Sequence, residues 1–139
     1  MRIITKEQTK ARLEQYSGLR LELHNRLQQL ARLQQADRDR PLPTGSRAEE
    51  YARRISGTVQ GNRRELTEVE AAVTALTDPI EREVLRLRYM VSETCRPMPW
   101  AQVADNIMHR YDQAVLHFIH RAHKKALQHL TAIWQESEQ

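Results

Sequence analysis

Two long segments of the first 77 residues repeat apolar side chains every three or four positions, the spacing of one face of an α-helix. The first segment covers residues 5–36 and begins at Thr5, a residue type that caps helices. Its apolar positions are Tyr16, Leu19, Leu23, Leu27, Leu30 and Leu33. The second segment follows Ser46 and places Ala52, Ile55, Val59, Asn62, Leu66, Val69, Val73 and Leu76 in alternating steps of three and four. Both patterns predict amphipathic helices, and the second has the spacing of a coiled-coil seam with one polar member.

The break between these stripes is residues 37–46, DRDRPLPTGS, in which two prolines, a glycine and alternating charges favour an exposed loop. Ser46 is a candidate N-cap, with Glu49 as the second half of a capping box. We expect the run SGTVQGN, with Gly57 and Gly61, to bend or fray the second helix.

Two such helices most simply fold back as an antiparallel hairpin in which each stripe covers the other. A homodimer through the seam is an alternative, and a solvated charged spacer is a third. The seam residues that would serve either the hairpin or the dimer are Ile55, Val59, Asn62, Leu66, Val69, Val73 and Leu76.

Three further helical patterns follow within residues 78–130. The first begins at Asp78-Pro79, a cap followed by proline at the first helical position, and runs to about Met90. The second begins at Pro99-Trp100 and is about nine residues long, and the third begins near Asp112. The expected inward residues are Ile80, Val84, Leu85, Leu87, Tyr89 and Val91 in the first, Val103, Ala104 and Ile107 in the second, and Val115, Phe118 or Ile119, Ala122, Ala126 and Leu130 in the third.

Composition supports an all-α fold, because four glycines, one phenylalanine and 29% charged residues suit helices better than a sheet, and no segment alternates like a strand. The apolar runs are too short to cross a bilayer, the first residues lack the apolar core of a secretory signal, and Cys95 cannot form an internal disulfide alone. We therefore expect a soluble, cytoplasmic protein that does not bind membranes.

The location of the charge says more than the net charge of +4, which permits nucleic-acid binding without requiring it. Residues 1–77 hold 14 basic and 10 acidic side chains, whereas residues 78–139 hold eight of each. The last helical pattern is nevertheless locally basic on its outer face. Its candidate DNA-binding residues are Arg110, Gln113, His117, His120, Arg121, Lys124 and Lys125. Glutamine, histidine and arginine can pair with base edges, and lysine neutralises phosphates.

Three motifs carry a resemblance: DPIEREVLRLRY at residues 78–89, W-x-x-V-A at residues 100–104, and the runs HRA and KKAL at residues 120–122 and 124–127. Together they resemble region four of sigma factors and, more closely, the phage and prophage transcriptional regulators of the RinA and ArpU type. The long helical pair before them extends the resemblance over nearly the whole chain. Residues 91–99 and 108–111 depart from it, since these connections are longer than usual and lack glycine.

The resemblance implies a helix-turn-helix domain at residues 78–130, preceded by an accessory hairpin at residues 1–77 and followed by a tail at residues 131–139. It further implies a recognition helix at residues 112–130 in the major groove of promoter or operator DNA. The implied role is activation of phage late genes in a bacterial host cell, with host RNA polymerase as a further partner. A domain of about 50 residues seldom supplies enough DNA contacts alone, so a homodimer through the seam of residues 52–76 is a further hypothesis.

Other functions have weaker support. His117, His120 and His123 step around the helix without a supporting ligand, so we expect neither a metal nor a cofactor. Cys95 and the glutamates Glu81, Glu83 and Glu93 form no catalytic pattern, so we do not expect an enzyme. The main alternative is a phage assembly or DNA-packaging adaptor that uses a helix-turn-helix and docks through an exposed Trp134. Against this, Trp134 could pack on Trp100 or on the hairpin.

Overall fold

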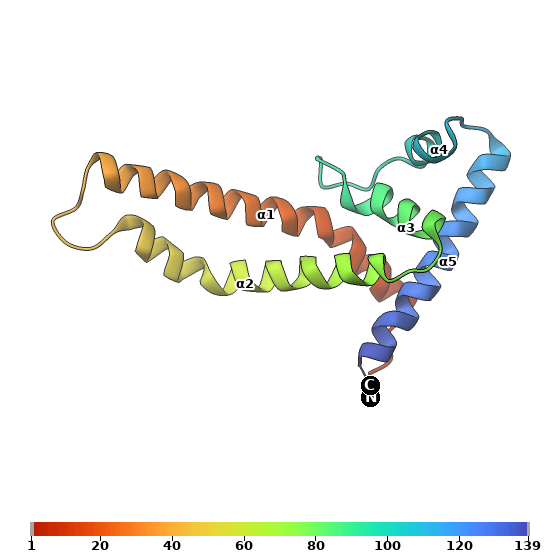
Figure 1. Ribbon diagram of the computed structural model, residues 1–139, viewed down its shortest axis with the longest axis horizontal. Helices are drawn as coiled ribbons and strands as arrows, with labels where there is room; N and C mark the ends of the chain where they lie inside the picture. The colour runs from red at the N-terminus through yellow and green to blue at the C-terminus, as the bar shows by residue number, and fades with distance from the viewer. Residues whose placement is uncertain (1, 139) are drawn as a thin grey trace. The chain divides into compact units, whose positions relative to one another are not determined.

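The computed structural model describes residues 2–138, so Met1 and Gln139, the outermost residues of the predicted accessory region and tail, lie outside it. Over this range the chain is helical and contains no strand, which confirms the all-α class (Figure 1). The helices are α1 (Lys6–Asp39), α2 (Arg47–Thr74), α3 (Pro79–Leu85), α4 (Trp100–Met108) and α5 (Gln113–Ser137), and a π-helical turn (Arg86–Met90) continues α3. None of the helices between residues 2 and 138 combines the length and apolarity needed to span a membrane.

The two long helices begin at the predicted caps. The Thr5 hydroxyl accepts the Gln8 amide N–H at 3.1 Å, and the Gln8 side-chain oxygen accepts the Thr5 N–H at 2.9 Å, which completes a capping box. The Ser46 hydroxyl accepts the Glu49 N–H at 3.2 Å. Of the bend or frayed turn expected at SGTVQGN, the frayed turn is wrong, because α2 continues through this run without interruption.

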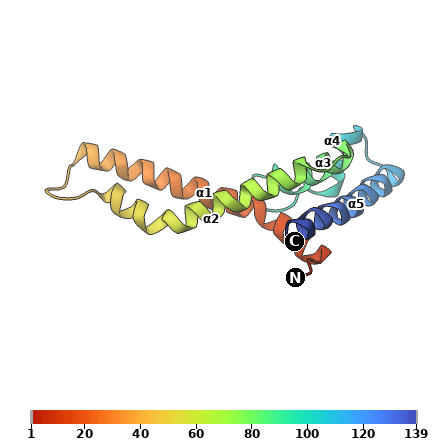
Figure 2. The ribbon, with the colours of Figure 1, turned by 60° about the horizontal axis from the view of Figure 1, so that its bottom comes forward.

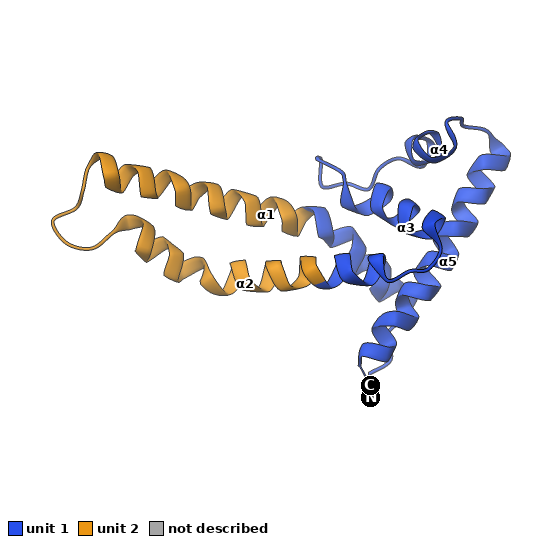
Figure 3. Cartoon of the chain, viewed as in Figure 1, with its two compact units in different colours: residues 1–17, 68–139 blue, residues 18–67 orange. Residues whose placement is uncertain are grey.

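The chain forms two compact units, residues 18–67 and residues 2–17 with 68–138 (Figure 3). The division expected at residue 77 placed all of α1 and α2 in one accessory region. In the structure the first turns of α1 and the last turns of α2 belong to the unit that contains α3, α4 and α5. The unit with the short helices is therefore assembled from two separate stretches of the chain.

The unit of residues 18–67 is an antiparallel hairpin (Figures 1 and 2). At its loop end the Asp37 carboxylate accepts the Ser46 hydroxyl at 2.6 Å and the backbone N–H groups of Arg47 and Ala48 at 3.2 and 3.0 Å. The hydrogen bonds from Ser46, Ala48 and Arg47 lower the pKa of Asp37 to about 2. The end of α1 thus caps the start of α2.

The predicted seam of α2 is covered by α1 of the same chain. Within the hairpin unit Ile55 and Leu66 are buried, and the buried Asn62 amide donates to the Glu22 carboxylate at 2.8 Å. Val59 is half-buried. In the other unit Val69, Val73 and Leu76 are buried, and the Arg12–Glu68 ion pair at 2.6 Å joins α1 to α2. Most of this seam is therefore buried within a single chain.

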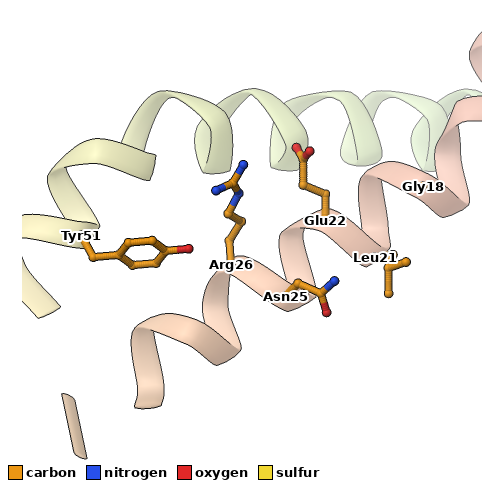
Figure 4. Close-up of a pocket in the computed structure, with 6 residues that line it drawn as sticks. All are labelled: Gly18, Leu21, Glu22, Asn25, Arg26 and Tyr51. Atoms are coloured by element: carbon orange, nitrogen blue, oxygen red, sulfur yellow. The ribbon is translucent and has the colours of Figure 1, made fainter. Parts of the chain in front are cut away.

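The hairpin leaves one side of its seam open. A shallow groove of about 410 Å³ is lined by Gly18, Leu21, Glu22, Asn25, Arg26 and Tyr51. Figure 4 shows Tyr51 projecting from α2 toward Arg26 of α1. Leu21 is 45% exposed, so part of the apolar surface of α1 remains in solvent.

The second unit has a closed core between α3, α4 and α5. Buried side chains from all three helices meet there: Val84, Leu87, Val103, Ala104, Val115, Ile119 and Ala122, with Ile80, Val91, Met98, Trp100 and Ile107 packed against them. The predicted inward faces are confirmed. Of the two candidates in α5, Ile119 is fully buried, whereas Phe118 is 37% exposed.

The π-helical turn was not predicted, because the pattern up to Met90 looked like continuous α-helix. A π turn shifts the backbone hydrogen bonds by one residue and leaves carbonyls for other partners. Two of these partners come from distant segments: the Ser17 hydroxyl donates to the Tyr89 carbonyl at 2.9 Å, and the Met98 N–H donates to the Arg88 carbonyl at 2.8 Å. The turn thereby connects α3 to both α1 and the connection before α4.

Residues 131–137, predicted as a tail, are instead part of α5, and the prediction of an exposed Trp134 is wrong. Trp134 is 6% exposed, and the Arg12 guanidinium lies 4.2 Å from its ring centroid. The Thr131 and Thr9 hydroxyls hydrogen bond at 2.7 Å, and the Ile4 N–H donates to Gln135 at 2.7 Å. Trp134 thus packs on the start of α1, as one of the sequence alternatives expected, and not on Trp100.

Candidate nucleic-acid interface

Helix α5 begins where the sequence predicts, because the Asp112 carboxylate accepts the Val115 N–H at 2.9 Å. One side of the helix enters the core through Val115, Ile119 and Ala122. The opposite side is therefore in solvent. All seven predicted DNA-binding residues are exposed on α5 or just before it: Arg110, Gln113, His117, His120, Arg121, Lys124 and Lys125.

Two of these seven have partners that restrict them. The Arg110 guanidinium forms an ion pair with the Asp112 carboxylate at 3.1 Å, so the N-cap residue offsets part of its charge. The His120 ring lies 4.7 Å from the Trp100 ring, centroid to centroid. Because Trp100 begins α4, this contact fixes the His120 ring against the neighbouring helix.

His123 is half-buried at the edge of the apolar side of α5. Its Nε2 atom lies 2.7 Å from the Tyr89 hydroxyl, and its ring lies 4.7 Å from that of Trp100. Burial, together with the nearby cations Arg88 and Lys10, lowers the pKa of His123 to about 4. His123 is therefore uncharged at neutral pH, and it packs against Tyr89 and Trp100 behind the exposed face of α5.

In the turn between α4 and α5, a histidine takes the left-handed conformation that glycine usually adopts. His109 adopts the left-handed conformation, with φ 58° and ψ 25°, and its N–H donates to the Asp105 carbonyl at 2.8 Å to end α4. Cys95 in the first connection has φ 63°. In both connections a residue with a side chain thus occupies a conformation that glycine adopts more easily.

Some residues beside the site were not identified from the sequence. Glu81 is only 3% exposed, and its carboxylate lies 2.6 Å from Nδ1 of His129 on α5. Lys6 and Lys10 of α1 line a groove together with Lys124. No local pattern shows these neighbours, since they come from segments more than 40 residues apart.

The three histidines of α5 do not converge. His117 and His120 are exposed, whereas His123 turns toward Tyr89. In the part of the chain that the structure describes, no group of three histidine, cysteine, aspartate or glutamate side chains is placed to hold a metal ion.

Comparisons were made with protein-family models, with curated proteins and with solved structures. None of the three finds a match to this chain. The resemblance to sigma region four and to the RinA and ArpU regulators therefore remains a prediction from the sequence motifs.

Proposed function

We propose that this protein is a sequence-specific DNA-binding transcriptional regulator with α5 as its recognition helix. The observation that carries the proposal is the two-sided character of α5. One side is locked into the α3–α4 core through Val115 and Ile119, and the other presents Gln113, His117, Arg121 and Lys124 to solvent. A short helix followed by a long one with a polar outer face is the arrangement that helix-turn-helix proteins place in the major groove.

The dimensions of this face suit the groove. From Gln113 to Lys124 the helix rises about 16 Å, which exceeds the roughly 12 Å width of the major groove. The start of α5 can therefore reach base edges while its middle lies near phosphates. In this arrangement Gln113, His117 and Arg121 contact bases, and Lys124 and Lys125 contact the backbone.

The regulatory role rests on the motif resemblance alone. It supports activation of phage late genes by contact with promoter DNA and with host RNA polymerase. A homodimer would add the DNA contacts that a domain of about 50 residues seldom supplies alone. The adaptor alternative was supported by an exposed Trp134. Because Trp134 is buried against Arg12, that specific support is gone.

The test is selection of binding sites from random duplex DNA, followed by affinity measurements on the enriched and an unrelated sequence at several salt concentrations. We expect one sequence to be enriched. Gln113→Ala should weaken binding to that sequence by about 1–3 kcal/mol and relax its selection at one position. Lys124→Ala should weaken binding to both DNAs equally and reduce the salt slope by about one.

The control is Arg63→Ala, which removes one exposed positive charge from α2 in the hairpin unit. It should leave the salt slope unchanged. Selection that enriches no sequence, with equal affinity for all DNA, would contradict a sequence-specific regulator and favour an adaptor.

A further inference from the structure

The start of α1 and the middle of α5 enclose a groove of about 330 Å³ within one compact unit. Lys6, Glu7 and Lys10 line it from α1, and His123, Lys124 and Leu127 line it from α5. Figures 1 and 2 both show the first turns of α1 beside α5. The groove thus joins the N-terminal segment to the helix that carries the proposed DNA-binding face.

The crossing of the two helices is fixed by contacts on the buried side of α1. Thr9 is 1% exposed and hydrogen bonds to Thr131, and Leu13 is fully buried. Arg12 stacks over the ring of Trp134. Lys6 and Lys10 are four residues apart and so project from the same face of α1. Their position beside Lys124 is therefore set by the fold and not by flexible ends of the chain.

The groove carries a net positive charge. Lys6, Lys10 and Lys124 are exposed, and none of their ammonium groups forms an ion pair with another residue of the described range 2–138. Glu7 supplies the one carboxylate among the lining residues. Three unpaired ammonium groups around one carboxylate would attract an anionic ligand.

We propose that Lys6 and Lys10 form, together with Lys124, a second phosphate-binding site for the backbone of the same DNA duplex that α5 recognises. This inference rests on the proposed function. Lys124 already belongs to the outer face of α5, so the groove extends the cationic surface from that helix onto α1. Lysines that contact phosphates add affinity and salt dependence but no sequence information.

The test compares Lys6→Gln/Lys10→Gln with Arg63→Gln/Arg64→Gln in the full chain. The second variant removes the same charge from exposed positions of the hairpin. Affinity for the selected and for an unrelated duplex is measured between about 50 and 200 mM salt, where counterion release makes binding salt-dependent. We expect the lysine variant to lower the salt slope by about two and to weaken both DNAs equally. The arginine variant should keep the wild-type slope.

Two further variants test whether the charge of the groove, and not a change in folding, causes the effect. Lys6→Arg/Lys10→Arg keeps the charges and should bind DNA like the wild-type chain. Glu7→Gln removes the carboxylate from the groove and should strengthen binding to both DNAs. Thermal melting followed by circular dichroism checks that each variant folds.

The outcomes separate the two proposals. If the wild-type chain binds selectively and the Lys6→Gln/Lys10→Gln slope is unchanged, the second site is wrong and the recognition helix stands. If the arginine variant loses as much slope as the lysine variant, overall charge and not the groove is responsible, which also overturns the second site. If the wild-type chain shows no salt-dependent binding to any duplex, both proposals fail.

Discussion

The two compact units use similar amphipathic helices but bury them to different depths. The largest fully buried side chains all belong to the unit of residues 2–17 and 68–138: Thr9, Leu13, Val69, Val84, Leu85, Val103, Ile119 and Leu130. In the hairpin of residues 18–67 the best-buried apolar side chains, Ile55, Ala48 and Leu66, remain 6–8% exposed. A regular apolar stripe therefore does not by itself indicate how well a helix is enclosed.

The difference has a geometric cause. Two helices cover each other only along one line of contact, so a further helix is needed to enclose a side chain on all sides. The hairpin has only two helices, so polar contacts also hold it together. These are the hydrogen bonds to Asp37 at the loop end and the Asn62–Glu22 hydrogen bond along the seam. The larger unit has helices on several sides of its core.

The largest expected effect comes from truncating matched isoleucines. Ile119→Ala should lower the free energy of unfolding by about 3–4 kcal/mol, because the rigid core around it cannot collapse into the cavity. Ile55→Ala should lower it by about half as much, since the open hairpin can relax. Denaturation in urea measures both. Equal losses would show that the hairpin is as tightly packed as the larger unit.

An intermediate loss of folding stability is expected when the pH is lowered, because His123 is protonated. The pKa of His123 is lowered to about 4 from an ordinary 6.5, so the unfolded chain binds more protons between these values. The stability present above pH 6.5 is therefore lost as pH falls toward 4. The loss is on the order of 1–2 kcal/mol once solvent screening of the partly exposed ring is allowed for.

Urea denaturation at pH 7 and pH 5 tests this, with His123→Gln as the variant that cannot titrate and should lose less. The Asp37 carboxylate of the hairpin has a pKa of about 2 and stays ionised over this range. Hydrogen-exchange protection should therefore fall in α5 and not at the loop end of the hairpin. Identical pH dependence in His123→Gln would exclude His123 as the cause.

The smallest effect concerns turns with positive φ. Gly45 in the hairpin loop has φ 77°, and His109 in the larger unit has φ 58°. His109→Gly should raise the free energy of unfolding by about 0.5–1 kcal/mol by relieving the left-handed backbone. Gly45→Ala should lower it by about 1 kcal/mol for the same reason. Thermal melting measures both, and a destabilised His109→Gly would mean that its side chain contributes more than the backbone strain removes.

The sequence predicted the helices well because their ends are marked locally. Asp78, Ser46 and Asp112 each accept the backbone hydrogen bond that their residue type favours. Helical spacing also identified the inward faces of α3, α4 and α5. These features depend only on neighbours within a turn or two of the chain.

The sequence did not reveal which helices meet. The predicted apolar stripe of α1 ran from Tyr16 to Leu33, and Tyr16 is buried. The best-buried residues of this helix are nevertheless Thr9 and Leu13, because α5 crosses it there. Residues 131–138 looked like a tail, although Trp134 completes that crossing. For the candidate site, the outer face of α5 could be predicted, whereas Lys6 and Lys10 lie near Lys124 only through the folded arrangement.

The crossing of α1 and α5 also sets an order for folding. Hairpin contacts join residues close in the chain, such as Ser46–Asp37 and Asn62–Glu22, 9 and 40 positions apart. The Thr9–Thr131 and Ile4–Gln135 contacts join residues 122 and 131 positions apart. Contacts this distant close large loops and form slowly. On the ribosome the hairpin can form while α5 is still being made, and the larger unit can close only after synthesis has passed residue 135.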